Sequence, residues 1–417
     1  MKKTIFTWLM LLGVVLAGKA QENFVGTWRG QLGLGGALKL NLVLHVTMDE
    51  NGQYACTLDS PDQGAKGIAG QLKVVQPDSI EVSVPLIGAS YTGRLKNDVI
   101  MGTFVQMGQK FSLDFERSAG AELRRPQTPM PPFPYKTEEV TFANEADGAT
   151  LAGTLTYPTG YDPTRQETTP IVLMVTGSGL QNRDEELFDH KPFLVIAHAL
   201  ACRGIATLRY DDRSKGKSVG GEVKNATTQH FMSDAAAGVD YLRHAGWERV
   251  GVLGHSEGAN IAFMLAAREK ADFIVSMAGI GVKGDTALTA QSNRILQLTG
   301  TAAQLTTAQY RQQVKQANSP WISYFINYDP AIDMAKTRCP VMAINGSKDC
   351  QVIADLNMEG ISKALPAGTP RRLATYEGLN HLFQHCETGL PSEYSNIEET
   401  LSPQVLEDMA GWILSLP

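Results

Sequence analysis

The residues with the clearest potential for chemistry form the sequence Gly254-His-Ser-Glu-Gly258. The apolar run 250–253 directly precedes this motif, and small and apolar residues typical of a helix follow it from Ala259. A serine at a sharp turn between a strand and a helix adopts strained backbone geometry. Side chains two residues to either side would collide, so both positions are glycine. The pattern predicts that Ser256 is a nucleophile raised above the edge of a sheet.

Two other glycine patterns fail when their context is considered. Gly216-Lys-Ser-Val-Gly220 has the same five-residue spacing, but it follows polar residues instead of an apolar strand, and no apolar helix comes after it. We therefore expect Ser218 to be structural. The run Gly279-Ile-Gly-Val-Lys-Gly284 fits the dinucleotide pattern, but no acidic residue for a ribose lies about twenty residues further on. We interpret it as a loop that leads into a cap.

A serine hydroxyl needs a base to take its proton and an acid to orient that base. In doubly wound hydrolases the chain order is serine, acid, histidine. Asp349 follows the apolar run 341–344 through a glycine turn, and His381 follows the last expected strand. His385 is the other histidine beyond Asp349, but it lies further from the strand end. The pair His381 and His385 lacks the glutamate of zinc-protease motifs, so we expect no metal.

Stabilisation of an oxyanion would require two backbone N–H groups. One is expected from Glu257, directly after the nucleophile. The other is expected from the glycine-containing loop 176–184, where Ser178 is the first candidate and Leu180 the second. The same glycines are also compatible with a simple tight turn.

These residues need a sheet to position them. Beyond residue 138, buried strands alternate with helices, which predicts an α/β domain with a doubly wound, mostly parallel sheet. Residues 285–335 are helical and polar, and are expected to form a cap over the site. The expected strands are 171–175, 205–208, 250–253, 273–277, 341–344 and 371–376.

The N-terminal part of the chain has a different pattern. Residues 21–118 contain about eight short segments that alternate apolar and polar residues, with a hairpin turn at Asp49-Glu-Asn-Gly52. This spacing predicts a small antiparallel all-β domain, either a barrel or a sandwich. Residues 119–137 carry many prolines, and we expect them to form a semi-rigid linker between this domain and residues 138–417.

The composition fits this two-domain organisation. The chain has 417 residues, of which 43% are hydrophobic and 19% charged, so it can bury large cores. Its net charge of −6 gives no indication of nucleic-acid binding. Residues 1–20 combine two lysines, an apolar stretch and small residues, which predicts a signal peptide; a single N-terminal anchor is the alternative. We expect a protein exported to the periplasm or outside the cell, without stable membrane insertion.

The motif 254–258, Asp349 and His381 together resemble the catalytic set of the α/β-hydrolase superfamily. Within it, the chain is similar to exported bacterial serine esterases and serine-aminopeptidase-like hydrolases, some of which carry a small β domain in front. The resemblance covers about residues 139–417. The chain departs from the family in the oxyanion loop, where it has Thr176-Gly177 instead of the usual His-Gly. Further stretches that carry the resemblance are Thr176-Gly-Ser-Gly, Asn182-Arg-Asp-Glu, Arg209-Tyr-Asp-Asp-Arg, Tyr328-Asp-Pro and Cys339-Pro-Val-Met.

The resemblance implies an acyl-enzyme mechanism on a small or medium acyl ester, with no cofactor. Trp321, Tyr324 and Phe325 are candidates for lining a substrate pocket, although their spacing fits core packing equally well. Cys350 and Cys386 lie in the loops that carry the acid and the base, so the fold would allow a disulfide between them. The sequence does not indicate an oligomeric state.

Two alternative functions remain open. An aminopeptidase could bind a substrate ammonium group through acidic residues near the site, for which the candidates are Asp184, Glu185, Glu186 and Glu257. A non-catalytic exported protein could instead bind a ligand in the β domain, where Gly26-Thr-Trp28 resembles the opening of lipid-binding barrels.

Overall fold

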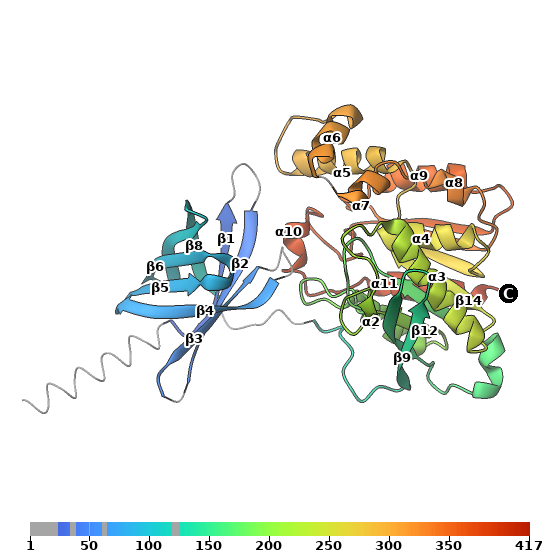
Figure 1. Cartoon of the computed structure of the whole chain (residues 1–417), viewed down its shortest axis with the longest axis horizontal. Coiled ribbons are helices and arrows are strands. Elements are labelled where there is room, and N and C mark those ends of the chain that lie inside the picture. The colour runs from blue at the N-terminus through green and yellow to red at the C-terminus, as the bar shows by residue number, and fades with distance from the viewer. Residues whose placement is uncertain (1–23, 34–38, 50, 61–64, 119–124, 318) are drawn as a thin grey trace, which may run out of the picture. The chain divides into compact units, whose positions relative to one another are not determined.

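The computed structural model describes residues 24–33, 39–49, 51–60, 65–118, 125–317 and 319–417. The chain divides into two compact units, Met1–Arg124 and Arg125–Pro417; Figure 1 colours the first unit blue and the second green to red. The expected signal peptide at residues 1–20 lies outside the described ranges. Within those ranges, no helix combines the length and apolar character that crossing a bilayer requires.

The first unit is a closed barrel of eight antiparallel strands, so the barrel is correct and the sandwich is not. Each strand pairs with its neighbour in sequence, and β1 also pairs with β8 to close the barrel. The strands are β1 Gly26–Gly33, β2 Lys39–Met48, β3 Tyr54–Ser60, β4 Ala65–Gln76, β5 Ser79–Val84, β6 Ala89–Lys96, β7 Val99–Gln106 and β8 Gln109–Arg117.

Large apolar side chains fill the barrel interior. Alternation along the strands sends every second residue inward, as in β5, and the buried set includes Trp28, Ile100 and Phe115. The Trp28 indole donates to the Phe24 carbonyl at 2.8 Å, and the Arg117 guanidinium lies 4.1 Å from the centre of its ring. A hydrogen bond and a cation–π interaction therefore hold the Trp28 side chain in place inside the barrel.

The second unit is built on a mixed sheet in the order β13-β10-β12-β11-β14-β15-β16-β17, with β9 paired to β10. The six consecutive strands β12-β11-β14-β15-β16-β17 are parallel to one another, as the alternation of strands and helices in the sequence predicts. They are β11 Ile171–Val175, β12 Ala206–Tyr210, β14 Val250–His255, β15 Phe273–Met277, β16 Val341–Gly346 and β17 Arg371–Tyr376.

An antiparallel hairpin precedes the parallel strands and was not predicted. It consists of β9 Thr137–Asn144 and β10 Ala149–Thr156, and β10 also pairs with the two-residue strand β13 Val219–Gly220. Val140 and Phe142, two positions apart, and the Asp147-Gly148 pair are the only weak signals of it in the sequence.

Helices cover both faces of this sheet and bury separate core clusters. One cluster contains residues of α2 and α11, and the other contains residues of α3, α4 and α9. These helices are α2 Pro192–Ala201, α3 Thr228–His244, α4 Glu257–Ala266, α9 Ala354–Ala364 and α11 Pro403–Ser415. The region between β15 and β16 contains α5 Gly284–Leu298, α6 Thr307–Val314, α7 Pro320–Phe325 and α8 Ala331–Met334.

The proline-rich segment from Arg125 onward makes hydrogen bonds with other parts of the second unit. The Arg125 guanidinium donates to the carbonyls of Phe188, Ser395 and Ile397. The Gln127 side chain bonds to the backbone at residues 400 and 401. Side chains of this segment therefore bond to the backbone of the second unit, so the segment is held without the backbone N–H groups that its prolines lack.

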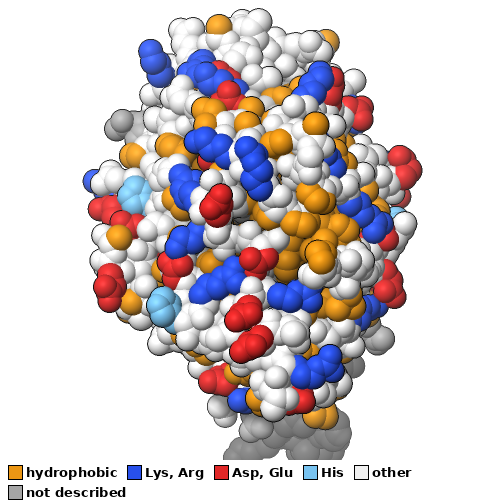
Figure 2. All heavy atoms as spheres, turned by 90° about the vertical axis from the view of Figure 1, so that its right-hand side faces the viewer, with side chains coloured by type: hydrophobic (Ala, Val, Ile, Leu, Met, Phe, Trp, Pro, Cys, Tyr) orange, Lys and Arg blue, Asp and Glu red, His pale blue; other side chains and the backbone are white. Residues whose placement is uncertain are grey.

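Charges of both signs are interspersed on the face of the molecule drawn in Figure 2, alongside a gathered hydrophobic region. Ion pairs such as Arg243 with Asp272 and Lys270 with Asp240 fit this mixed pattern. A broad basic field, the electrostatic footprint of nucleic-acid binders, is not apparent on this face.

Candidate active site

Ser256 sits at a strained turn between β14 and α4. Its backbone has φ 54° and ψ −116°, a conformation that L-residues rarely adopt. A Cβ atom at Gly254 would lie 2.0 Å from the Gly258 carbonyl oxygen, and one at Gly258 would lie 2.1 Å from the Val175 carbonyl oxygen. The structure therefore gives both glycines of the motif the steric reason that the sequence suggested.

His381 and Asp349 form a buried hydrogen-bonded pair. The His381 Nδ1 atom lies 2.7 Å from Asp349 Oδ2, and both residues are at most 5% exposed. The other carboxylate oxygen accepts the N–H groups of Gln351 and Val352, each at 2.8 Å. A carboxylate with these partners is fixed in an orientation that can hold the imidazole in one tautomer.

Close packing between loops brings this acid and base together. Gly346 ends β16, and a Cβ atom there would lie 2.2 Å from the Leu379 carbonyl oxygen. The Lys348 N–H also donates to that carbonyl. The acid loop and the base loop can therefore approach one another only because residue 346 has no side chain.

Ser256 and His381 line one cavity of about 300 Å³. Its apolar lining includes Ile280, Leu288 and Val352. Within the described residues, no hydrogen bond joins Ser256 Oγ to His381; such catalytic contacts often tighten only when substrate binds. The Ser256 side chain and the oriented imidazole of His381 therefore border the same cavity.

The two candidates for the second oxyanion donor have different positions. Ser178 lines the cavity, whereas Leu180 is not among the lining residues. Gly177 N–H donates to Glu185 Oε1 at 2.8 Å and is thus engaged elsewhere. Glu257 also lines the cavity, and its N–H belongs to the first turn of α4, where backbone donors lack partners within the helix.

Asp212 holds both ends of the loop that carries Ser178. Its carboxyl oxygens lie 3.2 Å from Thr176 Oγ1, and Oδ2 accepts the Gln181 N–H at 2.7 Å. Burial raises the pKa of Asp212 to about 8. Asp212 is therefore a positioning residue for the expected oxyanion loop, and its place in the sequence gave no sign of that role.

The aromatic residues expected to line the pocket separate into two groups. Phe325 lines the cavity, but Trp321 and Tyr324 are not among its lining residues. The Trp321 indole instead donates to both oxygens of Glu257, at 2.9 and 3.0 Å. Tyr324 bonds to the Gln229 side chain and stacks on Tyr328. Their place on a helix that packs against the core explains why only one of the three reaches the cavity.

The acidic residues considered for binding an ammonium group all have partners. Asp184 pairs with Arg209, Glu185 with His255, and Glu186 lies 3.8 Å from Lys191. Glu257 accepts from Thr228 Oγ1 at 2.6 Å and from the Trp321 indole. Burial raises the pKa of Glu257, because an ionised carboxylate without a partner is unfavourable in a buried position.

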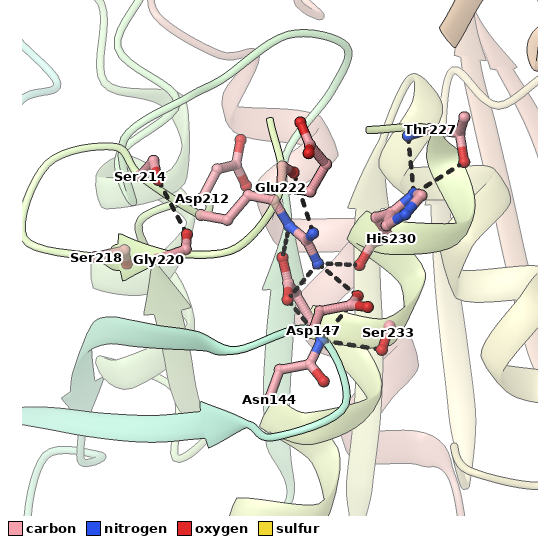
Figure 3. Close-up of polar contacts among 12 residues, drawn as sticks. Asn144, Asp147, Asp212, Ser214, Ser218, Gly220, Glu222, Thr227, His230 and Ser233 are labelled. Carbon is pink, nitrogen blue, oxygen red and sulfur yellow. Dashed lines mark hydrogen bonds and ion pairs between the residues drawn. The ribbon is translucent and has the colours of Figure 1, made fainter. Parts of the chain in front are cut away.

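A buried arginine network connects the turn between β9 and β10 to α3 (Figure 3). Arg213 bonds to Asp234 at 2.7 and 2.8 Å and to Asp147 at 2.9 Å, and its side chain is fully buried. Asn144 also donates to Asp234 at 2.8 Å. This network ties the β9–β10 turn to α3, the helix whose Thr228 reaches Glu257.

Residues set aside in the sequence have structural roles here. Ser218 is buried; its hydroxyl donates to the Asp211 carbonyl and accepts the Ala152 N–H. His385 pairs with Glu399 and is largely exposed. All five cysteines are free thiols, so no disulfide joins Cys350 to Cys386. Among the described residues, no cluster of His, Cys, Asp and Glu is arranged to hold a metal ion.

Comparison with known proteins gives a family match and a similar curated protein. Residues 191–343 match the family model described as serine aminopeptidase, S33. Esterase EstD from Thermotoga maritima is 27% identical over 326 residues, which cover 75% of this chain and 75% of that protein.

Two solved structures are also similar to this chain. The Pyrococcus furiosus esterase Pf2001 has 18% identity and a TM-score of 0.46, with 67% of this chain and 92% of that one covered. Est1E from Butyrivibrio proteoclasticus has 17% identity and a TM-score of 0.43, with 66% and 97% covered.

The family match, the relative and the order of the strands agree on the class of the second unit. This unit has an α/β-hydrolase fold, and an eight-stranded antiparallel barrel precedes it in the chain.

Proposed function

We propose that this protein is an exported serine hydrolase that cleaves acyl esters of small or medium size. Ser256 is the nucleophile, His381 the general base and Asp349 the residue that orients the base. The observation that carries the proposal is the 2.7 Å bond between His381 and Asp349 beside the cavity that Ser256 also lines.

The first half-reaction forms an acyl-enzyme. Ser256 Oγ attacks the acyl carbonyl carbon while His381 Nε2 accepts the hydroxyl proton, giving a tetrahedral oxyanion. The N–H of Glu257 and that of Ser178 bind this oxyanion. The bond to the alcohol then breaks, and His381 returns the proton to the departing alkoxide oxygen, which leaves as the alcohol.

The second half-reaction regenerates the serine. Water attacks the acyl carbonyl as His381 takes one of its protons, and the same N–H groups bind the new oxyanion. Collapse of this intermediate releases the carboxylic acid and returns the proton to Ser256 Oγ. Asp349 keeps its charge throughout and stabilises the imidazolium that forms in each step.

The lining of the cavity supports an acyl group of limited size. A space of about 300 Å³ with apolar walls from Ile280, Leu288, Phe325 and Val352 accommodates a short or medium chain. The name of the relative EstD describes it as an esterase, in line with this choice.

An ester substrate is favoured over a peptide with a free amino terminus. A substrate ammonium group would need an available carboxylate near Ser256, and the nearby acids Glu185 and Glu257 already have buried partners. A new cation beside them would displace hydrogen bonds that are costly to break.

Activity assays can decide between these functions. The purified protein should hydrolyse p-nitrophenyl acetate and butyrate, and should not hydrolyse aminoacyl p-nitroanilides. Activity on the anilides alone would favour the aminopeptidase. A fluorophosphonate probe should label Ser256, and failure of the folded protein to react would favour a non-catalytic binding protein.

Export is the part of the proposal that depends on residues 1–20. Their lysines, apolar stretch and small residues support removal of a signal peptide by the export machinery. Cell fractionation with N-terminal mass determination tests this. A full-length chain retained in the membrane fraction would instead indicate an N-terminal anchor.

A further inference from the structure

The residue before the nucleophile has an unusual set of partners. His255 Nδ1 lies 3.0 Å from Glu185 Oε1, and His255 Nε2 lies 3.0 Å from the backbone carbonyl oxygen of His381. The side chains of His255 and Glu185 are 8% and 5% exposed, so water does not replace these bonds. The imidazole of His255 therefore connects a buried carboxylate to the loop that carries the catalytic base.

The chemistry of these partners restricts the protonation of His255. A carbonyl oxygen can only accept, so Nε2 must carry a hydrogen. An ionised carboxylate can also only accept, so Nδ1 must carry one as well. The same oxygen of Glu185 already accepts the Gly177 N–H at 2.8 Å, as a negatively charged oxygen readily does.

We propose that Glu185 and imidazolium His255 are positioning residues that hold the oxyanion loop, the nucleophile turn and the base loop in one catalytic arrangement. The pair reaches the oxyanion loop through Gly177, the nucleophile through the peptide bond to Ser256, and the base loop through the His381 carbonyl. This inference rests on the proposed serine-hydrolase function and adds two residues to it.

The surroundings of His255 favour the charged form. Burial alone lowers the pKa of an imidazole, but the Glu185 charge and hydrogen bond, with Asp349 nearby, raise the pKa of His255 overall. The charged and titratable groups that face it are Glu185 after β11, Asp349 after β16 and His381 after β17. Two carboxylates therefore accompany two imidazoles in this buried cluster.

The positive charge also lies close to the base. The ring centres of His255 and His381 are 4.8 Å apart. The charge of His255 therefore lies directly beside the reacting imidazole. Removing the charge should thus alter the pH profile as well as the geometry.

The charge state can be tested directly in the full-length wild-type protein. After labelling histidine with ¹⁵N, NMR at about pH 8 should give protonated-nitrogen shifts for both ring nitrogens of His255, assigned through their loss in His255→Asn. One protonated and one bare nitrogen would overturn the proposal. This measurement needs no turnover, so its outcome is separate from whether the protein hydrolyses esters.

Kinetics of Glu185→Gln test the positioning role. We expect kcat to fall by about 10- to 100-fold with KM changed by less than about threefold, because the reacting groups lose their alignment. The pH profile of kcat/KM should also differ from that of the wild type, because the charge beside His381 is lost. The control is Glu186→Gln, which removes the adjacent, more exposed carboxylate. If both variants keep the wild-type rate and pH profile, the proposal is wrong.

Discussion

The imidazole of His381 and the carboxylate of Asp349 are joined by a 2.7 Å hydrogen bond in a setting that excludes most solvent. Thirty-two positions separate them in the chain, and the contact exists because the loops after β16 and β17 pack together at Gly346. Because the sheet is parallel there, the ends of neighbouring strands deliver the acid and the base to the same edge.

Replacing the nucleophile should abolish turnover. Ser256→Ala removes the attacking oxygen, and kcat on p-nitrophenyl butyrate is expected to fall by at least about 10⁴-fold. The matched control is Ser218→Ala, since this serine lies in the same five-residue pattern but bonds to Asp211 and Ala152. Loss of fluorophosphonate labelling in Ser218→Ala but not in Ser256→Ala would reverse the assignment.

Replacing the acid should leave binding intact but slow the chemistry. In Asp349→Asn, the amide can present a donor to His381 Nδ1, which stabilises the wrong tautomer of the base. We expect kcat to fall by about 10⁴-fold with little change in KM. Steady-state kinetics on p-nitrophenyl esters check this, and circular dichroism confirms that the variant is folded. A decrease of less than about tenfold would mean that another acid orients the base.

The protonated state of Asp212 should make stability depend on pH. With its pKa raised from 3.8 to about 8, the folded protein keeps this proton while the unfolded chain releases it between those values. The stability that the folded protein gains from protonated Asp212 is complete below about pH 4 and is lost as pH rises through about 8. Asn copies the neutral acid, so Asp212→Asn should flatten this dependence and raise the free energy of unfolding at about pH 8.5 by on the order of 1 kcal/mol or more.

Urea unfolding at about pH 5 and pH 8.5 measures the effect of that substitution. Asp240→Asn is the control, because this carboxylate is paired with Lys270 near the surface of α3. A difference between the two pH values in Asp212→Asn as large as that of the wild type would contradict the assignment.

The contact between α7 and the nucleophile turn should contribute to stability. Trp321→Phe keeps the ring but removes the N–H that Glu257 accepts, which leaves a buried carboxyl with one donor fewer. The expected loss in the free energy of unfolding is about 1–3 kcal/mol. Trp412→Phe is a suitable comparison, since Trp412 makes a ring contact with Phe273. Equal effects in the two variants would indicate that only ring size matters.

The sequence predicted the features that depend on local sterics or on strand order. Such features leave a pattern in neighbouring residues. Examples are the glycines of 254–258, the alternation of apolar strands with helices, and the alternation of apolar and polar residues in the strands of the first unit. Asp349 and His381 could be proposed because each lies a few residues after the end of a strand, β16 and β17 respectively.

What the sequence could not reveal depends on contacts between distant segments. The bond from Trp321 to Glu257 joins a cap helix to the nucleophile turn, and spacing along the helix does not show which face reaches it. Likewise, the Glu185 and His255 pair spans 70 positions, and neither residue follows a pattern for such pairing. The hairpin β9–β10 was missed because most of β9 is exposed, so its apolar residues are few.

The anchoring of the proline-rich segment affects how the hydrolase unit can be isolated. A fragment trimmed to begin at residue 138 would lack Arg125 and Gln127, whose side chains satisfy backbone groups of residues 188 and 395–401. The next residue, Ser402, donates its N–H to the carbonyl of Phe383, two residues beyond His381. A shortened enzyme should therefore begin no later than Arg125, so that the truncation does not loosen the framework behind its own base.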